Sequence, residues 1–358
     1  MPGVAPAEHE TPDAIAWVDG LFASIGLEHG TRSTRSGTWA GGLRVKPAKA
    51  SETKLPVSRL APGIERVPGW EKYEWLRAGF STRLNGASTA YNYEDVGELN
   101  LGWTEADSQQ AVEENRRRFL KTLVGKGSAE MVTVRQTHTP IIRQVLADQG
   151  PLATETGRAV LRGDALMSSV PGLMLGVQTA DCVPVLVADV KKRVVAAFHA
   201  GWRGTLARMV ERGIGTMRLE YGSRPQDLVA AVGPSIGACC YAVGEEVKFE
   251  FLSQFAYGEA LFSEVYDSDP IRDKYPLLFL TARAPGHSPI GPQIHLDLWE
   301  ANRRQLLDAG VSAKKITVLG ECTACTRLKN GRRKYFSHRS EHGYTGRMIS
   351  AIGVVNQK

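Results

Sequence analysis

Residues 178–204 read Gln178-Thr-Ala-Asp-Cys-Val-Pro-Val-Leu-Val-Ala-Asp-Val-Lys-Lys-Arg-Val-Val-Ala-Ala-Phe-His-Ala-Gly-Trp-Arg-Gly204. Two apolar runs rich in β-branched residues flank a short polar segment at residues 189–192, and this pattern predicts a β-hairpin with a four-residue loop. In the expected register Ala188 pairs with Arg193, and all other pairs along the two strands follow from that one.

The expected register places Cys182 directly opposite His199. Directly opposed residues share a face, with Cβ atoms roughly 4.5–5.5 Å apart, so a thiol and an imidazole come within reach of one metal ion or of each other. His138, at the end of a predicted strand, is the candidate third donor. Two His and one Cys suit a tetrahedral zinc ion with its fourth position open, as in catalytic sites. In the alternative interpretation Cys182 is a small buried packing residue.

The composition is that of a folded, globular chain. It has 358 residues, of which 42% are hydrophobic and 23% are charged, enough for one large domain or two ordinary ones. No apolar run approaches the roughly 18 residues that a membrane span needs. Five cysteines in a chain of this length do not indicate a disulfide framework. Acidic residues near the N-terminus argue against a transit peptide, so a cytoplasmic protein is predicted.

The net charge of +6 and the pI near 9 are compatible with an anionic substrate such as phosphate or a nucleotide. The basic residues are scattered along the chain, and the densest cluster, at 329–334, is typical of a solvated loop. Neither nucleic-acid nor membrane binding is therefore predicted.

The chain is expected to divide into an N-terminal extension, residues 1–70, and a catalytic domain, residues 71–358. The extension contains one amphipathic helix over 12–26 and a tether rich in Gly, Ser, Thr and Pro. In the domain, short strands alternate with helices, and the hairpin favours an α+β fold with mixed β-sheets flanked by helices. We expect strands at 76–82, 131–135, 173–177, 228–232 and 316–319, and helices at 104–123, 205–221, 245–255 and 297–309.

Three further side chains near the hairpin are candidates for chemistry. Arg203 follows a Gly-containing turn at the start of a helix, where free N–H groups and a guanidinium could bind an anion. Asp181 precedes the thiol, and Asp164 precedes a predicted strand; either could orient a ligand or act as a general acid or base. As an alternative, both carboxylates cap turns. His338 and Arg347 are candidates to close a pocket.

The remaining cysteines give no clear metal signal. Cys239 and Cys240 lie in a turn rich in Gly and Pro and are expected to pack there. Cys322 and Cys325 have the spacing of a metal knuckle, but no second pair of Cys or His follows at finger spacing.

An ordered set of short motifs resembles the laccase-domain family, first described as multi-copper polyphenol oxidases and now as zinc purine nucleoside phosphorylases, with bacterial members linked to peptidoglycan editing. The resemblance covers about residues 75–355. The motifs are Gly79-Phe-Ser-Thr-Arg83, Asn100-Leu-Gly102, Glu114-Asn-Arg116, Gln136-Thr-His138, Gly163-Asp-Ala165, Thr179-Ala-Asp-Cys182, His199-Ala-Gly-Trp-Arg-Gly204, Gly233-Pro-Ser-Ile-Gly237, Cys322-Thr323, Phe336-Ser-His-Arg339 and Thr345-Gly-Arg347.

The resemblance implies a four-layer α-β-β-α sandwich. It also implies that His138, Cys182 and His199 bind zinc. The implied reaction is phosphorolysis of adenosine, inosine, guanosine and methylthioadenosine to the base and ribose 1-phosphate, with adenosine deamination as a second activity. We hypothesise that Arg203 and Arg83 hold phosphate in this reaction, and that Asp181 or Asp164 moves protons during deamination. The oligomeric state stays open.

Three other functions remain open from the sequence. A single-copper polyphenol oxidase would use the same ligands, because His and Cys also suit copper; eight His in all are too few for the four-copper centre of a laccase. A metal-free hydrolase would use Cys182 as nucleophile and His199 as base on a peptidoglycan-precursor amide. A non-enzymatic scaffold would bind a partner through the N-terminal helix.

Overall fold

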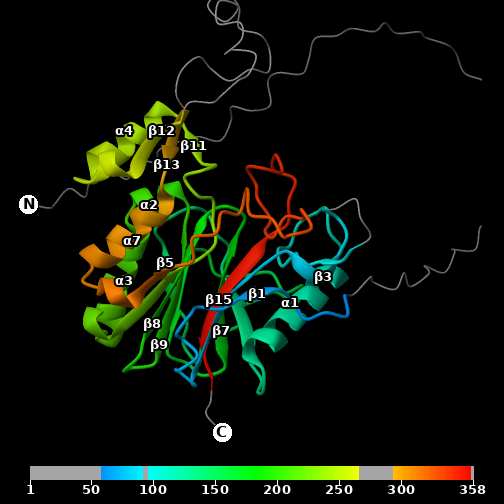
Figure 1. The fold of residues 1–358 in the computed structure, drawn as a ribbon. Coiled ribbons are helices and arrows are strands. Elements are labelled where there is room, and N and C mark those ends of the chain that lie inside the picture. Colours follow the sequence, from blue (N-terminus) through cyan, green and yellow to red (C-terminus); the bar gives the residue numbers. More distant parts are fainter. Residues whose placement is uncertain (1–57, 92–95, 266–292, 356–358) are drawn as a thin grey trace, which may run out of the picture. The chain divides into compact units, whose positions relative to one another are not determined.

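The computed structural model describes residues 58–91, 96–265 and 293–355, all within one compact unit, residues 53–358 (Figure 1). The helix expected over 12–26 lies outside the described residues. Within the expected extension, Ile64–Glu65 form a short strand, β1, that pairs with Leu76–Ser81, β2. Val67 and Trp70 are buried in the hydrophobic core. The folded body therefore begins before residue 70.

Two large mixed sheets carry the fold, as the hairpin predicted. In the five-stranded sheet the order is β1, β2, β15 (Met348–Val354), β7 (Leu173–Thr179) and β4 (Glu130–Thr133). In the six-stranded sheet it is β14 (Ile316–Val318), β10 (Leu228–Val232), β8 (Val183–Asp189), β9 (Val194–Ala200), β6 (Ala165–Ser168) and β5 (Ile142–Gln144). Each sheet contains both parallel and antiparallel pairs.

Smaller elements complete the described part. A third sheet joins β11 (Ala242–Val243), β13 (Gln293–Leu296) and β12 (Phe262–Val265), and β3 spans Leu84–Ser88. The described α-helices are α1 (Gln109–Val124), α2 (Trp202–Leu206), α3 (Met209–Tyr221), α4 (Glu245–Gln254) and α7 (Leu298–Asp308).

Alternation along the strands of the hairpin sets the layers. On β8, Leu186 and Ala188 belong to the core shared with β2, β7 and β15 of the other sheet, whereas Val185 and Val187 belong to a second core, shared with α3 and α7. A third core lies between α1 and the outer face of the five-stranded sheet. The two sheets thus pack face to face with helices on their outer faces, as Figure 1 shows.

The expected register of the hairpin is wrong by two positions, because Ala188 pairs with Val195 and not with Arg193. The loop consists of residues 190–193. The carboxylate of Asp189 accepts hydrogen bonds from the N–H groups of the two loop lysines, both at 2.9 Å, and Arg193 adopts a left-handed conformation with φ of 56°. Asp189 therefore caps the turn while it remains paired with Val194 in the strand. The loop lies one residue further along the chain than expected.

The single helix expected over 205–221 is two helices. Arg208, between α2 and α3, has a left-handed conformation with φ of 57°, which interrupts the helix. Its guanidinium donates to Glu211 and to the carbonyl of Gln254, both at 2.7 Å. These tertiary contacts hold the break in place, and the apolar periodicity gives no sign of it. The other expected strands and helices occur at or near the expected residues.

Candidate metal and substrate site

The two histidines and the thiol meet at one end of the facing sheets, where β4, β8 and β9 lie close together. His138 follows β4, Cys182 directly precedes β8, and His199 is the penultimate residue of β9. Their ligand atoms all lie within 4.8 Å of one another. The Cys182 Sγ atom is 3.9 Å from His138 Nε2, and the two imidazole rings are 5.1 Å apart.

The shifted register preserves this cluster. Pro184, and not Cys182, lies opposite His199. Because the shift is two residues and side chains alternate with a period of two, Cys182 and His199 still share the face toward the other sheet. A shift of a single residue would have separated them.

The backbone around the cluster adopts conformations that are rare for residues with side chains. His138 has φ of 58° and Asp181 has φ of 98°. Such strain persists where surrounding contacts over-determine it, as is common at functional sites. Gly201 follows β9, and a Cβ atom there would lie 2.8 Å from Cys182 Sγ. A glycine is needed at this position because the thiol approaches the backbone so closely.

The carboxylate of Asp164 is hydrogen-bonded to both histidines. It lies 2.9 Å from Nδ1 of His199 and accepts hydrogen bonds from the N–H groups of Thr137, His138 and Thr139. Burial alone would raise the pKa of Asp164, but these hydrogen bonds and the charge of His199 lower it to about 2. With Nδ1 bound to a carboxylate, His199 presents Nε2 to the cluster, as metal-binding histidines do.

Without a metal, the cluster favours a thiolate beside an imidazolium. Burial would raise the pKa of Cys182, but the charge of His199 and hydrogen bonds from both histidines lower it to about 6. Burial would lower the pKa of His199, but Cys182 and Asp164 raise it to about 9. Two imidazoles and a readily ionised thiol at this spacing fit a transition-metal ion such as zinc. Because His138 is exposed, the cluster is accessible to solvent on that side.

The cluster borders a cavity of about 980 Å³. This volume is at the upper end of the range for small-molecule sites. The lining is rich in cationic and aromatic side chains, which recognise anions and flat rings. The lining includes Trp103, Arg135, Gln136, Arg158, Gln178, Asp181, Tyr241, His338, Arg339 and Arg347, with His138, Cys182 and His199.

Asp181 borders this cavity, and both of its carboxylate oxygens are hydrogen-bonded. Thr323 Oγ1 donates to Oδ1 and the Arg339 N–H donates to Oδ2, each at 2.7 Å. Ile236 N–H donates to the Asp181 carbonyl. Asp181 thereby joins three loops beside Cys182.

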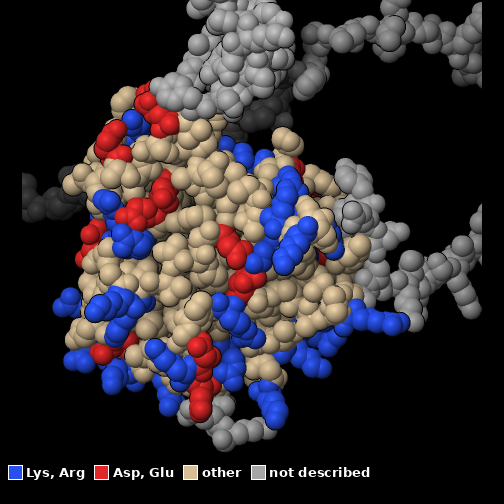
Figure 2. All heavy atoms as spheres, viewed as in Figure 1, with Lys and Arg blue, Asp and Glu red and all other residues tan. Residues whose placement is uncertain are grey.

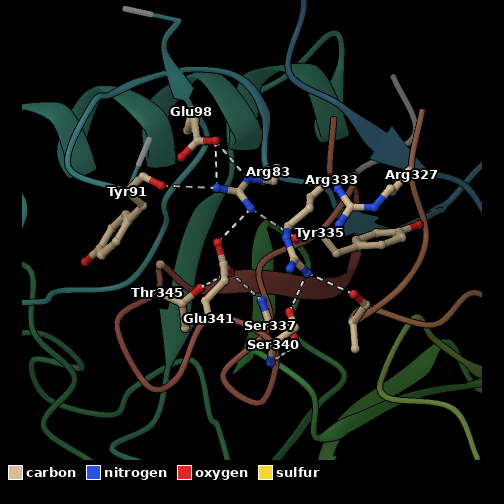
Figure 3. Close-up of polar contacts among 12 residues, drawn as sticks. Arg83, Tyr91, Glu98, Arg327, Arg333, Tyr335, Ser337, Ser340, Glu341 and Thr345 are labelled. Carbon is tan, nitrogen blue, oxygen red and sulfur yellow. Dashed lines mark hydrogen bonds and ion pairs between the residues drawn. The ribbon is translucent and has the colours of Figure 1, made fainter. Parts of the chain in front are cut away.

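The two arginines expected to bind phosphate, Arg203 and Arg83, do not line this cavity. Arg203 stacks on Trp202, with its guanidinium carbon 4.3 Å from the ring centroid, and lines a separate depression beside α4. Arg83 is buried between two carboxylates: Glu98 lies 2.8 Å away and Glu341 2.9 Å away (Figure 3). Neither residue is in the cavity lining, so their binding of phosphate stays a prediction.

Sequence reasoning did not single out Arg158, Arg339 or Tyr241 as site residues, although all three line the cavity. Arg339 lies in the motif Phe336-Ser-His-Arg339, so the resemblance contained a signal for it. Arg158 lies in a loop that no motif marks. His338 and Arg347, named from the sequence as able to close a pocket, do line it.

Figure 2 shows one face of the molecule, on which basic side chains occur in several places, including a group at the upper right, with acidic side chains between them. Among the helices within the described ranges, none has the length and apolar character of a membrane span.

The chain belongs to the laccase-domain family, because the family described as multi-copper polyphenol oxidoreductase laccase matches residues 77–355. A relative from Geobacillus stearothermophilus, named purine nucleoside phosphorylase YlmD, is 32% identical over 78% of this chain and 94% of its own length. A prokaryotic relative named adenosine deaminase RL5 is 30% identical over 66% of this chain and 79% of its own length. The solved structure of Bacillus licheniformis YfiH superposes with a TM-score of 0.65 at 29% identity, covering 82% of this chain and 97% of that one.

Proposed function

We propose that this protein is a zinc-dependent purine nucleoside phosphorylase that also deaminates adenosine. Its substrates would be adenosine, inosine, guanosine and methylthioadenosine, which yield the free base and ribose 1-phosphate. The observation that carries this proposal is the His138–Cys182–His199 cluster on the wall of a 980 Å³ cavity lined by arginines. Relatives named for the two activities support it.

His138, Cys182 and His199 would hold the metal. When bound there, zinc supplies Lewis acidity and activates water, the chemistry that deamination of adenine requires. Copper would accept the same donors, so metal identity is an outcome of the experiment below. Asp164 would act through His199: its bond to Nδ1 fixes the ring and leaves Nε2 as the nitrogen that would bind the metal.

The cationic wall of the cavity would bind phosphate. Arg339 and Arg347 come from the loop before β15, and Arg158 comes from the loop before β6. Guanidinium groups suit phosphate oxygens, and phosphate held below the ribose would attack the anomeric carbon as the base departs. Positive charge developing on the sugar is stabilised by the bound phosphate itself.

Two side chains near Cys182 would bind the purine base and transfer its proton. Burial, together with the nearby charge of Cys182, raises the pKa of Tyr241 to about 12, so its hydroxyl stays a hydrogen-bond donor. Asp181, a carboxylate in the cavity lining, would move a proton to or from the purine. Trp103 offers an aromatic surface to the same space.

One arrangement favours a second candidate function, a hydrolase without metal. Asp164, His199 and Cys182 follow one another in the order orienting acid, base and nucleophile, as in triads that cleave acyl bonds. In such an enzyme the Cys182 thiolate would attack an amide carbonyl, for example in a peptidoglycan precursor, and form a thioester while the amine leaves with a proton from His199. Water would then hydrolyse the thioester, which releases the carboxylic acid and restores the thiol.

The deciding experiment measures adenosine turnover with and without phosphate, resolving adenine from inosine, on protein of measured metal content. Phosphate-dependent adenine release that disappears in Cys182→Ser and His138→Ala supports the phosphorylase. Deamination is supported if inosine forms without phosphate and disappears in the same variants. If fully metal-loaded protein turns over no purine nucleoside, the phosphorylase proposal fails. Amide hydrolysis that survives chelation would then favour the hydrolase.

A further inference from the structure

Cys322 and Cys325 have no second cysteine pair nearby in the sequence. In the fold, Cys239 and Cys240 form that second pair beside them. The four Sγ atoms all lie within 4.8 Å of one another, and those of Cys239 and Cys325 are 3.7 Å apart. These are all the cysteines of the chain except Cys182. This cluster shares no residue with the His138–Cys182–His199 cluster.

Neighbouring strands bring the two pairs together. β10 and β14 are parallel partners, so the loops that follow them leave the sheet at the same end. Ser235, in the first loop, donates to the carbonyl of Glu321 at 3.3 Å and accepts from Thr323 N–H at 3.0 Å. The two loops are therefore bonded directly beside the cysteines.

The loop around Cys322 has the geometry of a metal knuckle. Its Sγ accepts a hydrogen bond from Gly237 N–H at 3.3 Å, and Thr326 N–H donates to its carbonyl at 3.0 Å, closing a tight turn. A backbone N–H that donates to a sulfur stabilises the thiolate, which is the form that binds a metal ion.

Four thiolates within 4.8 Å of one another would repel each other without a cation between them. A divalent ion removes this repulsion by binding every thiolate, and tetrahedral tetrathiolate coordination is characteristic of structural zinc.

We infer that Cys239, Cys240, Cys322 and Cys325 form a second metal centre, a closed tetrathiolate zinc site. Four protein ligands fill a tetrahedral shell, so this centre has no open position for substrate. Its role is structural: the metal joins the loop after β10 to the loop after β14.

The joined loops also support the candidate active site. Thr323, between the knuckle cysteines, donates to the Asp181 carboxylate at 2.7 Å, and Ile236 N–H donates to the Asp181 carbonyl at 2.9 Å. Asp181 directly precedes Cys182. The second centre therefore holds the loops that position Asp181, without touching the cavity metal.

Metal content of the full chain tests the inference. Protein purified with zinc under reducing conditions should hold two zinc ions, one for each cluster. The double variant Cys239→Ser/Cys325→Ser should hold one, and so should the variant His138→Ala/Cys182→Ser, which removes the other cluster. Cys239 and Cys325 are both exposed, so their replacement leaves the buried core unchanged. Equal zinc content in wild type and the Cys239→Ser/Cys325→Ser variant would overturn the inference.

Cobalt substitution tests the same site without relying on a Cys239→Ser/Cys325→Ser protein that folds. In the His138→Ala/Cys182→Ser variant, bound Co²⁺ should show the strong sulfur-to-metal charge-transfer absorption of several thiolates. Absence of that absorption would contradict the inference. Thiol mapping of denatured, chelated and unreduced protein supplies the other test: all four cysteines should be alkylated. Recovery of a disulfide-linked peptide joining the two loops would show that the cluster is a redox pair instead. None of these readouts requires nucleoside turnover, so failure of the proposed function leaves them intact.

Discussion

Oδ1 of Asp164 lies 2.9 Å from Nδ1 of His199, and the same carboxylate accepts the N–H group of His138. One buried side chain thus orients two of the three candidate metal ligands. Substitution of Asp164 should therefore affect metal binding more than folding.

Asp164→Asn should weaken zinc binding about 10–100-fold, the usual cost of losing a group that orients a metal ligand. The asparagine amide would point an NH2 group at the backbone N–H groups and at the His199 ring, all of which need a hydrogen-bond acceptor. Zinc affinity is measured by competition with a chromophoric chelator. Asp189→Asn is the matched control, since Asp189 is an equally buried carboxylate that caps the hairpin loop; that variant should keep its zinc affinity. Equal losses in both variants would contradict the assigned role.

The reactivity of Cys182 should depend on pH in the metal-free protein. Because the pKa of Cys182 is lowered to about 6, the thiolate forms as the pH rises through 6. The rate of alkylation of the Cys182 peptide, followed by mass spectrometry, should therefore rise through that region and level off above it. In Asp164→Asn the rise should move to higher pH, because His199 loses the carboxylate that favours its charged form. A wild-type rate that rises only above pH 8 would refute the thiolate–imidazolium pair.

Gly201→Ala should damage the cluster by crowding. The added methyl would lie 2.8 Å from Cys182 Sγ, and overpacking of this kind costs about 1–3 kcal/mol, equivalent to about a 5- to 150-fold loss of zinc affinity. Gly215→Ala, in α3, is the control: nothing lies within 4 Å of the added methyl, and stability should rise by about 0.5–1 kcal/mol. Unchanged zinc binding in Gly201→Ala would mean that the thiol can move freely.

Arg83→Met should cost about 3–5 kcal/mol of unfolding free energy, because it leaves the carboxylates of Glu98 and Glu341 buried without their cation. Urea unfolding gives this value. Arg117→Met removes an exposed ion pair with Glu114 and should cost less than about 1 kcal/mol. Similar small losses in both variants would show that the buried pairs do not hold the loop before β15.

Arg339→Gln should raise the KM for phosphate about 10–100-fold with a smaller change in the KM for adenosine. A charge-assisted hydrogen bond contributes about 1.5–3 kcal/mol, and each 1.4 kcal/mol is about tenfold. The Arg339 side chain lines the cavity, while its bond to Asp181 comes from the backbone and survives the substitution. Arg203→Gln tests the assignment made from the sequence. A rise in phosphate KM in that variant alone would favour Arg203 as the phosphate ligand.

Local periodicity identified much of the fold. The alternation in residues 183–200 correctly indicated the two central strands, and a period of two kept Cys182 and His199 on one face even though the register was wrong. That periodicity did not report the turn around Asp189, which local side-chain hydrogen bonds set. It also gave no sign of the left-handed conformation of Arg208, which donates to the distant carbonyl of Gln254.

The sequence by itself indicated the hairpin and five other strands, most helices, the family and the candidate donors at residues 138, 182 and 199, since these depend on short-range pattern and side-chain chemistry. It did not indicate β15, the central strand of the five-stranded sheet. Only the tertiary structure decided which distant loops meet. It enclosed Arg83 among carboxylates and moved Arg203 away from the cavity. It also joined Cys239 and Cys240 to a cysteine pair more than 80 residues away. Strand order in a sheet sets such meetings, and strand order is a property of the whole packed chain.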